Sequence, residues 1–388
     1  MKIAILSAFT VSSEMSIKDL LSDDDPICYK SFHPHPWASI LAQSLAKINN
    51  NEVHVLTMFG DVKKDRYFEY NNVKYYLIKS TSIPFKAITF FKSNKWKMHK
   101  ILREIKPDIV HAQGRGREAY FGLISGFPCV VTNHGQNREF YNINCKRNLK
   151  CFCDNWKEKR ANRLMEYCIG VSPNCTNDSK RFLPEKNVFL IDNPIDPVFF
   201  KTNDLSFDNT IMFVGSIIPR KNVLELVKAV HKIKNAELKI ISFTKTGNYF
   251  DLVADYIKEN SLGNRVIILG QKNFMELSTE LSKCLAICLP SKYESFGMVL
   301  AEAMAVGKPA IGSNIEGIRH VIDDNVNGFL VEPGNVKQIA EKISFLMNNK
   351  SVAMKMGQNA KQKALSRWHP DIIAKKTYDV YKKILSNL

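Results

Sequence analysis

The stretch that decides the fold runs from Leu289 to Pro309 and reads LPSKYESFGMVLAEAMAVGKP. The apolar segment 284–289 predicts a buried strand that ends in a polar loop. The small and apolar residues between Gly297 and Gly307 then predict a short helix that ends at a glycine. A helix that begins after a strand has free amides at its N-terminus, and these amides bind anions. The stretch therefore predicts a strand–loop–helix unit with an anion site at its turn.

Two glutamates occupy different positions in this unit. Glu294 lies in the loop before the helix, and Glu302 lies eight residues later, more than one turn into the helix. Carboxylates accept hydrogen bonds from hydroxyl groups, so the pair is suited to holding two parts of an extended, hydroxyl-rich ligand. Glutamates in helices are more often solvated surface residues, and the spacing alone leaves that alternative open.

Short apolar segments alternate with helical segments along the chain, which predicts parallel α/β architecture. The predicted strands lie at 2–7, 52–58, 73–78, 108–112, 128–132, 168–171 and 187–191, and then at 210–215, 237–242, 265–269, 284–289, 309–312 and 328–331. Two prolines in the segment 193–197 interrupt the pattern, and 388 residues are too many for one ordinary core. We therefore expect two doubly wound domains with a cleft between them, and functional residues in the loops after strands.

The composition is that of a globular protein, with 45% hydrophobic and 24% charged residues. No apolar run reaches the length of a membrane span. The short apolar N-terminus suits a strand better than a signal peptide. The nine cysteines show no disulfide framework. These features predict a cytoplasmic protein. The net charge of +17 is spread over both halves of the chain, so it favours anionic ligands without selecting one class.

Residues 289–309 closely resemble the family 4 retaining glycosyltransferases of the GT-B fold, and Glu294 and Glu302 match the family's E-x7-E motif. Three further segments extend the resemblance: 213–221 (FVGSIIPRK), 193–196 (NPID) and 328–334 (GFLVEPG). The resemblance implies two Rossmann-like domains that face each other across a cleft. Residues 1–193, with a returning helix at 370–388, would bind the acceptor, and residues 194–369 would bind a nucleotide sugar.

The resemblance also implies a role for each matching residue of the donor site. Glu302 would hold the ribose hydroxyls, Glu294 would hold hydroxyls of the donor sugar, and Lys221 would neutralise the diphosphate leaving group. The other donor-binding candidates are Gly215, Ser216, Arg220, Gly270, Phe296, Gly297, Met298 and Val299. Family members usually carry arginine where this chain has Ser216. One diphosphate cation is therefore missing, and Arg220 is the candidate substitute.

The activity implied is transfer of a hexose-type sugar from a UDP- or GDP-sugar, with retention and by a front-face mechanism. No metal or other cofactor is expected. The acceptor would be a glycan, a lipid-linked sugar or a small molecule. Two alternatives stay open. One is a GT-B relative that acts on nucleotide sugars without transfer, such as an epimerase or phosphorylase. The other, from charge alone, is a nucleic-acid-binding protein, although no recognition module for nucleic acid is evident.

The N-terminal half offers candidates for catalysis and acceptor binding. His134 lies in VTNHG, which resembles the family's T-x-H-G turn and implies a histidine that acts on the donor sugar; a loop histidine bonded to backbone is the alternative. Arg115 and Arg117 lie in GRGREA, which fits G-x-G-x-x-A without the placement of a dinucleotide site. We predict that they hold a charged acceptor. His35 lies in a long segment that is either an acceptor-binding loop or a surface insertion.

Residues 83–106 carry seven basic residues and one acidic residue, with aromatic residues between them. This composition predicts a helix that lies on an anionic membrane surface, as a lipid-linked acceptor at the inner face of a membrane would require. An ordinary amphipathic surface helix is equally consistent with it.

Overall fold

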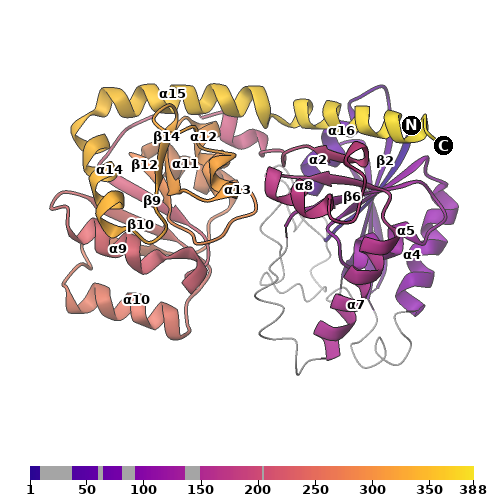
Figure 1. Cartoon of the computed structure of the whole chain (residues 1–388), viewed down its shortest axis with the longest axis horizontal. Helices are drawn as coiled ribbons and strands as arrows, with labels where there is room; N and C mark the ends of the chain where they lie inside the picture. The colour runs from indigo at the N-terminus through magenta and orange to yellow at the C-terminus, as the bar shows by residue number, and fades with distance from the viewer. Residues whose placement is uncertain (9–36, 60–63, 81–91, 136–148, 203–204) are drawn as a thin grey trace. The chain divides into compact units, whose positions relative to one another are not determined.

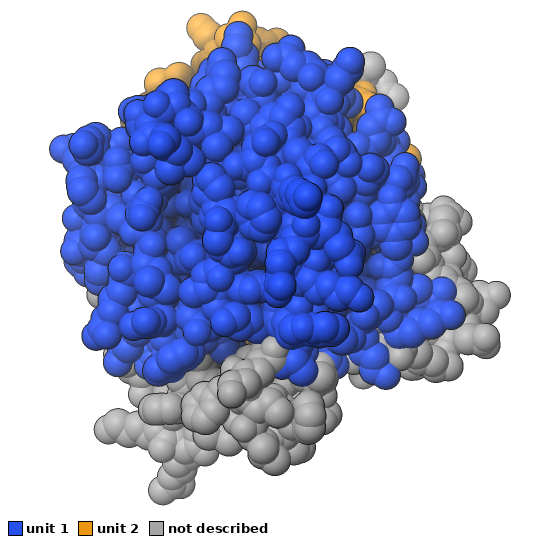
Figure 2. Space-filling model, turned by 90° about the vertical axis from the view of Figure 1, so that its right-hand side faces the viewer, with its two compact units in different colours: residues 1–194, 370–388 blue, residues 195–369 orange. Residues whose placement is uncertain are grey.

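The computed structural model describes residues 1–8, 37–59, 64–80, 92–135, 149–202 and 205–388. The chain divides into two compact units, which Figure 2 distinguishes by colour. Unit 1 contains Met1–Pro194 and Pro370–Leu388, and unit 2 contains Ile195–His369. These boundaries lie within one residue of the predicted domain boundaries. No helix in the described ranges is long and apolar enough to cross a membrane.

Unit 1 is built on a sheet of mostly parallel strands with helices on both faces (Figure 1). Its elements are β1 (Lys2–Leu6), α2 (Trp37–Ala46), β2 (Glu52–Phe59), β3 (Arg66–Tyr70), β4 (Val73–Lys79), α4 (Lys92–Ile105), β5 (Ile109–Gln113), α5 (Arg117–Leu123), β6 (Cys129–Asn133), α7 (Leu149–Leu164), β7 (Tyr167–Gly170), α8 (Pro173–Ser179), η3 (Glu185–Asn187), β8 (Val188–Leu190) and α16 (Pro370–Leu385).

The strand order of unit 1 is β3-β4-β2-β1-β5-β6-β7-β8, and β1 pairs in parallel with both β2 and β5. The sheet is therefore wound outward in two directions from the β1/β5 boundary. Strand β3 was not predicted, and it is the antiparallel edge strand, paired with β4. Asn71 and Asn72 join the two strands with positive φ angles of 48° and 58°. Such a two-residue turn is a hairpin signal that the sequence already contains.

Two clusters of apolar side chains form the core of unit 1, one on each face of its sheet. The first cluster joins Ile3 and Ile5 of β1 to helices α2 and α16, whose buried residues include Leu45 and Tyr381. The second joins Ala4 and Leu6 of the same strand to residues of α4, α5 and α7. Strand β1 is buried on both faces, as expected of a central parallel strand. Helix α16, from the C-terminal end of the chain, is thus part of the core of unit 1.

Unit 2 repeats this architecture with a smaller parallel sheet (Figure 1). Its elements are η4 (Pro197–Phe200), β9 (Thr210–Val214), η5 (Pro219–Lys221), α9 (Val223–His231), β10 (Glu237–Ile241), α10 (Asn248–Glu259), β11 (Val266–Leu269), α11 (Phe274–Lys283), β12 (Ala286–Leu289), α12 (Met298–Val306), β13 (Ala310–Ser313), α13 (Glu316–Arg319), β14 (Gly328–Val331), α14 (Val336–Asn348) and α15 (Lys350–Arg367).

The strand order of unit 2 is β11-β10-β9-β12-β13-β14. Strand β9 pairs in parallel with β10 on one side and with β12 on the other. The winding direction therefore changes between β9 and β12. In open α/β sheets, ligands bind beyond the carboxyl ends of the strands at such a boundary. The loops that follow β9 and β12 are consequently the first place to look for a binding site.

Candidate functional site

Three hydrogen bonds to backbone carbonyl oxygens join the loops after β9 and β12. The Lys292 amide donates to the Arg220 carbonyl oxygen at 2.8 Å, and the Arg220 guanidinium donates to the Tyr293 carbonyl oxygen at 2.6 Å. The Asn222 side-chain amide donates to the Pro290 carbonyl oxygen at 3.0 Å. Asn222 was not among the predicted site residues. These bonds hold the two loops together at the carboxyl edge of the sheet.

Three charged side chains meet where these loops touch. The Lys221 ammonium lies 2.5 Å from Glu294 Oε1, and the Arg220 guanidinium lies 3.5 Å from the same oxygen. The Lys221 and Glu294 side chains are 13% and 11% exposed, so both have lost most of their contact with water. Two cations surround one carboxylate, so the group keeps a net positive charge. Because the group is largely shielded from water, it favours an anionic ligand.

The start of α12 completes the site. Gly297 is the N-cap of α12 and has a φ of 90°, a conformation that residues with side chains rarely adopt. The amides of Met298 and Val299 belong to the first turn, where no preceding turn supplies an acceptor. Phe296 is buried, with its ring 6.0 Å from those of His320 and Trp368. A glycine turn, helix amides and a buried aromatic ring therefore lie together at the place where the sequence predicts an anion site.

Gly317 on α13 lets the Glu294 loop take its position. A side chain at Gly317 would place its Cβ 2.0 Å from the carbonyl oxygen of Glu294. That distance is far below contact, so only glycine fits without a shift of the backbone. Residue 317 was not predicted to matter. The only sequence signal is a lone glycine inside a short helix.

Glu302 is buried within α12. Its side chain has lost its water, and this burial raises the pKa of its carboxyl from 4.5 to about 8; the nearby Asp196 acts in the same direction. The carboxyl is therefore protonated at neutral pH in this structure. Neither Glu302 nor Glu294 is a solvated surface residue, so the alternative left open by their spacing is wrong.

The remaining donor-binding candidates lie on the same edge of the sheet. Gly215 follows β9, and a Cβ there would lie 3.7 Å from Lys221 Cε. The Ser216 carbonyl oxygen accepts the Ile218 amide at 3.1 Å. Gly270 is exposed and follows β11, the edge strand two positions from β9. Gly215 thus adjoins the charged cluster, whereas Gly270 lies farther along the sheet edge.

His134 follows β6 in unit 1. Its Nε2 lies 2.8 Å from Gln113 Oε1, and its ring stacks on Trp37 with centroids 4.5 Å apart. The imidazole is thus held by side chains, although the predicted alternative was a bond to backbone. Gln113 and Trp37 were not predicted as site residues. Gln113 is the last residue of β5, a position where a polar side chain is a usable signal.

The two arginines proposed to hold an acceptor are engaged within unit 1. Arg115 has a side chain only 4% exposed, and its guanidinium lies 2.6 Å from Asp178 and 3.7 Å from Glu158. In this structure the Arg115 guanidinium is therefore buried against two carboxylates, an arrangement that gives no support to the predicted acceptor contact. Arg117 is partly exposed and pairs with Glu118 at 2.6 Å. His35 lies outside the described residues.

Part of the basic segment 83–106 is described, namely α4. Met98, Leu102 and Ile105 on this helix are buried in the core of unit 1. The helix therefore has the amphipathic character of an ordinary surface helix. Trp96 points outward and is 60% exposed, and the Lys100 ammonium lies 5.8 Å from its ring centre. Any membrane contact would use this aromatic residue and the surrounding lysines.

The family assignment follows from two sequence models that together span most of the chain. Residues 38–199 match the model described as Glycosyltransferase Family 4, and residues 196–363 match Glycosyl transferases group 1. The chain belongs to glycosyltransferase family 4. This assignment agrees with the charged cluster, the glycine turn and the helix start described above.

Several characterised and uncharacterised relatives resemble this glycosyltransferase over most of their length. An uncharacterized glycosyltransferase of Methanocaldococcus jannaschii is 25% identical over 325 residues, which are 81% of this chain and 86% of the relative. The Escherichia coli UDP-Gal:alpha-D-GlcNAc-diphosphoundecaprenol alpha-1,3-galactosyltransferase is 26% identical over 317 residues, which are 75% of this chain and 79% of the relative.

Solved structures show the same fold. Sucrose-phosphate synthase from Thermosynechococcus elongatus superposes with a TM-score of 0.77 at 18% identity, covering 100% of both chains. Anabaena HepE, solved with UDP and glucose, gives a TM-score of 0.74 at 18% identity, covering 98% of this chain and 99% of HepE. The glycosyltransferase therefore has the GT-B fold, as the sequence predicted.

Proposed function

We propose that this glycosyltransferase moves a sugar from a UDP- or GDP-sugar to a glycan, lipid-linked or small-molecule acceptor, with retention at the anomeric carbon. The observation that carries the proposal is the cluster of Lys221, Arg220 and Glu294 at the β9/β12 boundary. It combines cations for a diphosphate with a carboxylate for sugar hydroxyls. The start of α12 adds backbone amides beside it.

The cations have a purpose in the transition state. As the bond to the sugar breaks, negative charge grows on the departing nucleoside diphosphate. Lys221 and Arg220, with the Met298 and Val299 amides, are suited to stabilise that charge, and fixed donors do so without reorganisation. With these cations in place, we propose that the reaction needs no metal. The departing phosphate would itself assist deprotonation of the acceptor in a front-face mechanism.

Glu294 and Glu302 would bind two different parts of the donor. Glu294 is now bonded to Lys221. A diphosphate that attracts Lys221 would leave Glu294 oxygens available to accept hydrogen bonds from the sugar hydroxyls. Glu302, deeper in α12, would hold the ribose hydroxyls. His134, on unit 1, would act on the sugar that is transferred. The E. coli relative, whose name specifies UDP-Gal and a diphosphoundecaprenol acceptor, supports a nucleotide-sugar donor and a lipid-linked acceptor.

We further propose that α4 contacts an anionic membrane surface, which would bring the enzyme to a lipid-linked acceptor. The support is the exposed Trp96 ring, with Lys95, Lys97, Lys100 and Arg103 on the same helix. Aromatic and basic side chains together favour the interface of an anionic bilayer.

The decisive experiment combines a thermal-shift screen with product analysis. UDP-, GDP- and ADP-sugars are screened for stabilisation, and the best donor is incubated with candidate acceptors while NMR reads the anomeric configuration of the product. Retained configuration and a strict requirement for an acceptor support the proposal. An altered donor sugar without any acceptor would instead indicate epimerisation, and release of a sugar phosphate would indicate a phosphorylase.

The Glu294→Gln variant tests the site itself. We expect kcat to fall by about 100-fold or more, as for loss of a group that acts in the transition state. Glu341→Gln, an exposed position on α14, is the matched control and should leave kcat unchanged. Equal turnover of both variants would remove Glu294 from the mechanism.

A further inference from the structure

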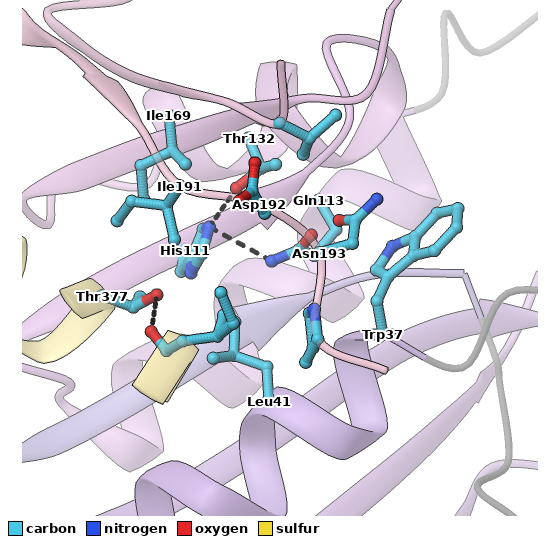
Figure 3. A pocket seen from close by; sticks show the side chains of 13 residues that line it. Trp37, Leu41, His111, Gln113, Thr132, Ile169, Ile191, Asp192, Asn193 and Thr377 are labelled. Carbon is cyan, nitrogen blue, oxygen red and sulfur yellow. Dashed lines mark hydrogen bonds between the residues drawn. The ribbon is translucent and has the colours of Figure 1, made fainter. Parts of the chain in front are cut away.

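A chain of four hydrogen-bonded side chains runs through unit 1 from α16 to His134. Tyr381 Oη lies 2.6 Å from His111 Nδ1, and His111 Nε2 lies 3.1 Å from Gln113 Nε2. Gln113 Oε1 then lies 2.8 Å from His134 Nε2. Thr132 Oγ1 contacts His111 Nε2 at 2.6 Å. Figure 3 shows His111, Gln113 and Thr132 together, with Trp37 at the same cavity.

Burial keeps the inner members of this chain neutral. His111 is 1% exposed, and the loss of water lowers its pKa to about 3. Burial likewise raises the pKa of Tyr381 well above its ordinary value. At neutral pH, His111 therefore carries one N–H, and the position of that proton depends on its hydrogen-bond partners.

The orientation of the Gln113 amide sets where the protons lie. With its NH2 group facing His111 Nε2, that nitrogen accepts, from Gln113 at 3.1 Å and from the Thr132 hydroxyl at 2.6 Å, so the His111 proton lies on Nδ1 and is donated to Tyr381 Oη. Its carbonyl oxygen faces His134 Nε2 and can only accept, so His134 carries its proton on Nε2. Reversing the amide would reverse the direction of every bond. The chain of bonds thus has two self-consistent arrangements, and the first is the one in which Tyr381 Oη accepts from His111 Nδ1–H.

We infer that Tyr381, His111 and Gln113 are positioning residues that keep the proton of His134 on Nε2 and hold its ring against Trp37. The inference deepens the proposed function, on which the catalytic relevance of His134 rests. A fixed tautomer gives each ring nitrogen of His134 one defined role, with Nε2 as the donor to Gln113 and Nδ1 as an acceptor. Residues on α16 thereby influence a histidine about 250 positions earlier in the chain.

The test is Tyr381→Phe in the full chain, read by NMR of 15N-histidine-labelled protein at pH 8. The variant leaves His111 Nδ1–H without its acceptor, a cost of about 1–3 kcal/mol in a buried site. His111 should then move its proton to Nε2, the Gln113 amide should turn over, and the proton of His134 should move to Nδ1. The spectrum of His134→Gln identifies the His134 signals. Tyr378→Phe, on the same helix, is the matched control and should leave the tautomer unchanged.

A second substitution restores the original state. Glutamate at position 113 offers only acceptor oxygens, so Gln113→Glu added to Tyr381→Phe should return the His134 proton to Nε2. An unchanged His134 tautomer in folded Tyr381→Phe, or no return in the double variant, overturns the inference. If the Tyr381 hydroxyl had only a structural role, its loss would change the stability of the protein but would not move the His134 proton from one ring nitrogen to the other.

Activity separates this inference from the proposed function. If His134 acts in transfer, Tyr381→Phe should lower kcat by about tenfold, the value of one misdirected hydrogen bond. A tautomer that moves without loss of kcat, while His134→Ala does lose kcat, overturns the positioning role. Unchanged kcat in His134→Ala refutes the catalytic assignment of His134, and the NMR result then still decides whether Tyr381 controls the tautomer of His134.

Discussion

The buried carboxyl of Glu302 should make the stability of unit 2 depend on pH in an unusual direction. In the unfolded chain this carboxyl has a pKa of 4.5, and in the folded chain its burial raises the pKa to about 8. Between these values the folded state binds the proton that the unfolded state has released. Stability from this residue is therefore greatest at low pH, falls as the pH rises from about 4.5 to about 8, and is constant above that.

The size of the effect follows from the two pKa values. Keeping Glu302 buried costs about 1 kcal/mol at pH 5 and about 5 kcal/mol at pH 9, because each pH unit in the window is worth about 1.4 kcal/mol. Glu302→Gln has the same shape and no charge, so it removes the pH-dependent part of the cost. The advantage of the variant should therefore grow by about 4 kcal/mol between pH 5 and pH 9.

Thermal unfolding of the wild type and Glu302→Gln at pH 5, 7 and 9 measures this difference. For a unit of this size, about 4 kcal/mol corresponds to roughly 8–16 °C in Tm. Groups that titrate equally in both proteins cancel in the comparison. Glu341→Gln, whose side chain is exposed, should show no such trend. Parallel curves of Tm against pH for the wild type and Glu302→Gln would refute the account of Glu302 as a protonated, buried carboxyl.

Three further predictions concern the donor site, its support and the helix α4. Lys221→Met should weaken binding of the nucleoside diphosphate that the donor screen selects by about 10–100-fold, the worth of a charge-assisted hydrogen bond, and calorimetry measures it; unchanged affinity contradicts the assignment. Gly317→Ala should lower Tm, because its Cβ would meet the Glu294 carbonyl at 2.0 Å, whereas Gly263→Ala, which meets nothing within 4 Å, should not. Trp96→Ala should reduce co-sedimentation with anionic vesicles at low salt without changing kcat on a soluble acceptor; equal sedimentation argues against a membrane contact through α4.

The strand pattern could be predicted closely because the central strands are continuous apolar runs. Segments such as 210–214 and 328–331 are buried on both faces, so their length is visible directly in the sequence. Strand β3 was missed because it lies at an edge, where exposed Tyr67 alternates with less exposed residues. The strongest sequence signal for β3 was the asparagine pair Asn71 and Asn72. This pair indicates the hairpin turn and not the strand itself.

The strand–loop–helix unit that carries Glu294 and Glu302 could be predicted because its parts are close in sequence. Glu294, Gly297 and Glu302 lie within nine residues of one another on one loop and one helix. The contacts of Arg115 could not be predicted, because Asp178 and Glu158 come from helices α8 and α7 much later in the chain. Such long-range contacts depend on how helices and strands pack together. The spacing of residues along the sequence does not show that packing.

Arg220 is the candidate substitute for the arginine that family members usually carry at the position of Ser216. The Arg220 guanidinium is held on two sides, by the Tyr293 carbonyl oxygen at 2.6 Å and by Glu294 at 3.5 Å, so it occupies a defined position beside Lys221. An arginine fixed in this way loses less conformational entropy on binding a phosphate than a free surface cation does. Because both cations share Glu294, a diphosphate that engages them also changes the surroundings of that carboxylate. Under the proposed function, donor binding and the presentation of Glu294 to the sugar would be coupled through this one cluster, in loops that backbone and side-chain bonds tie together.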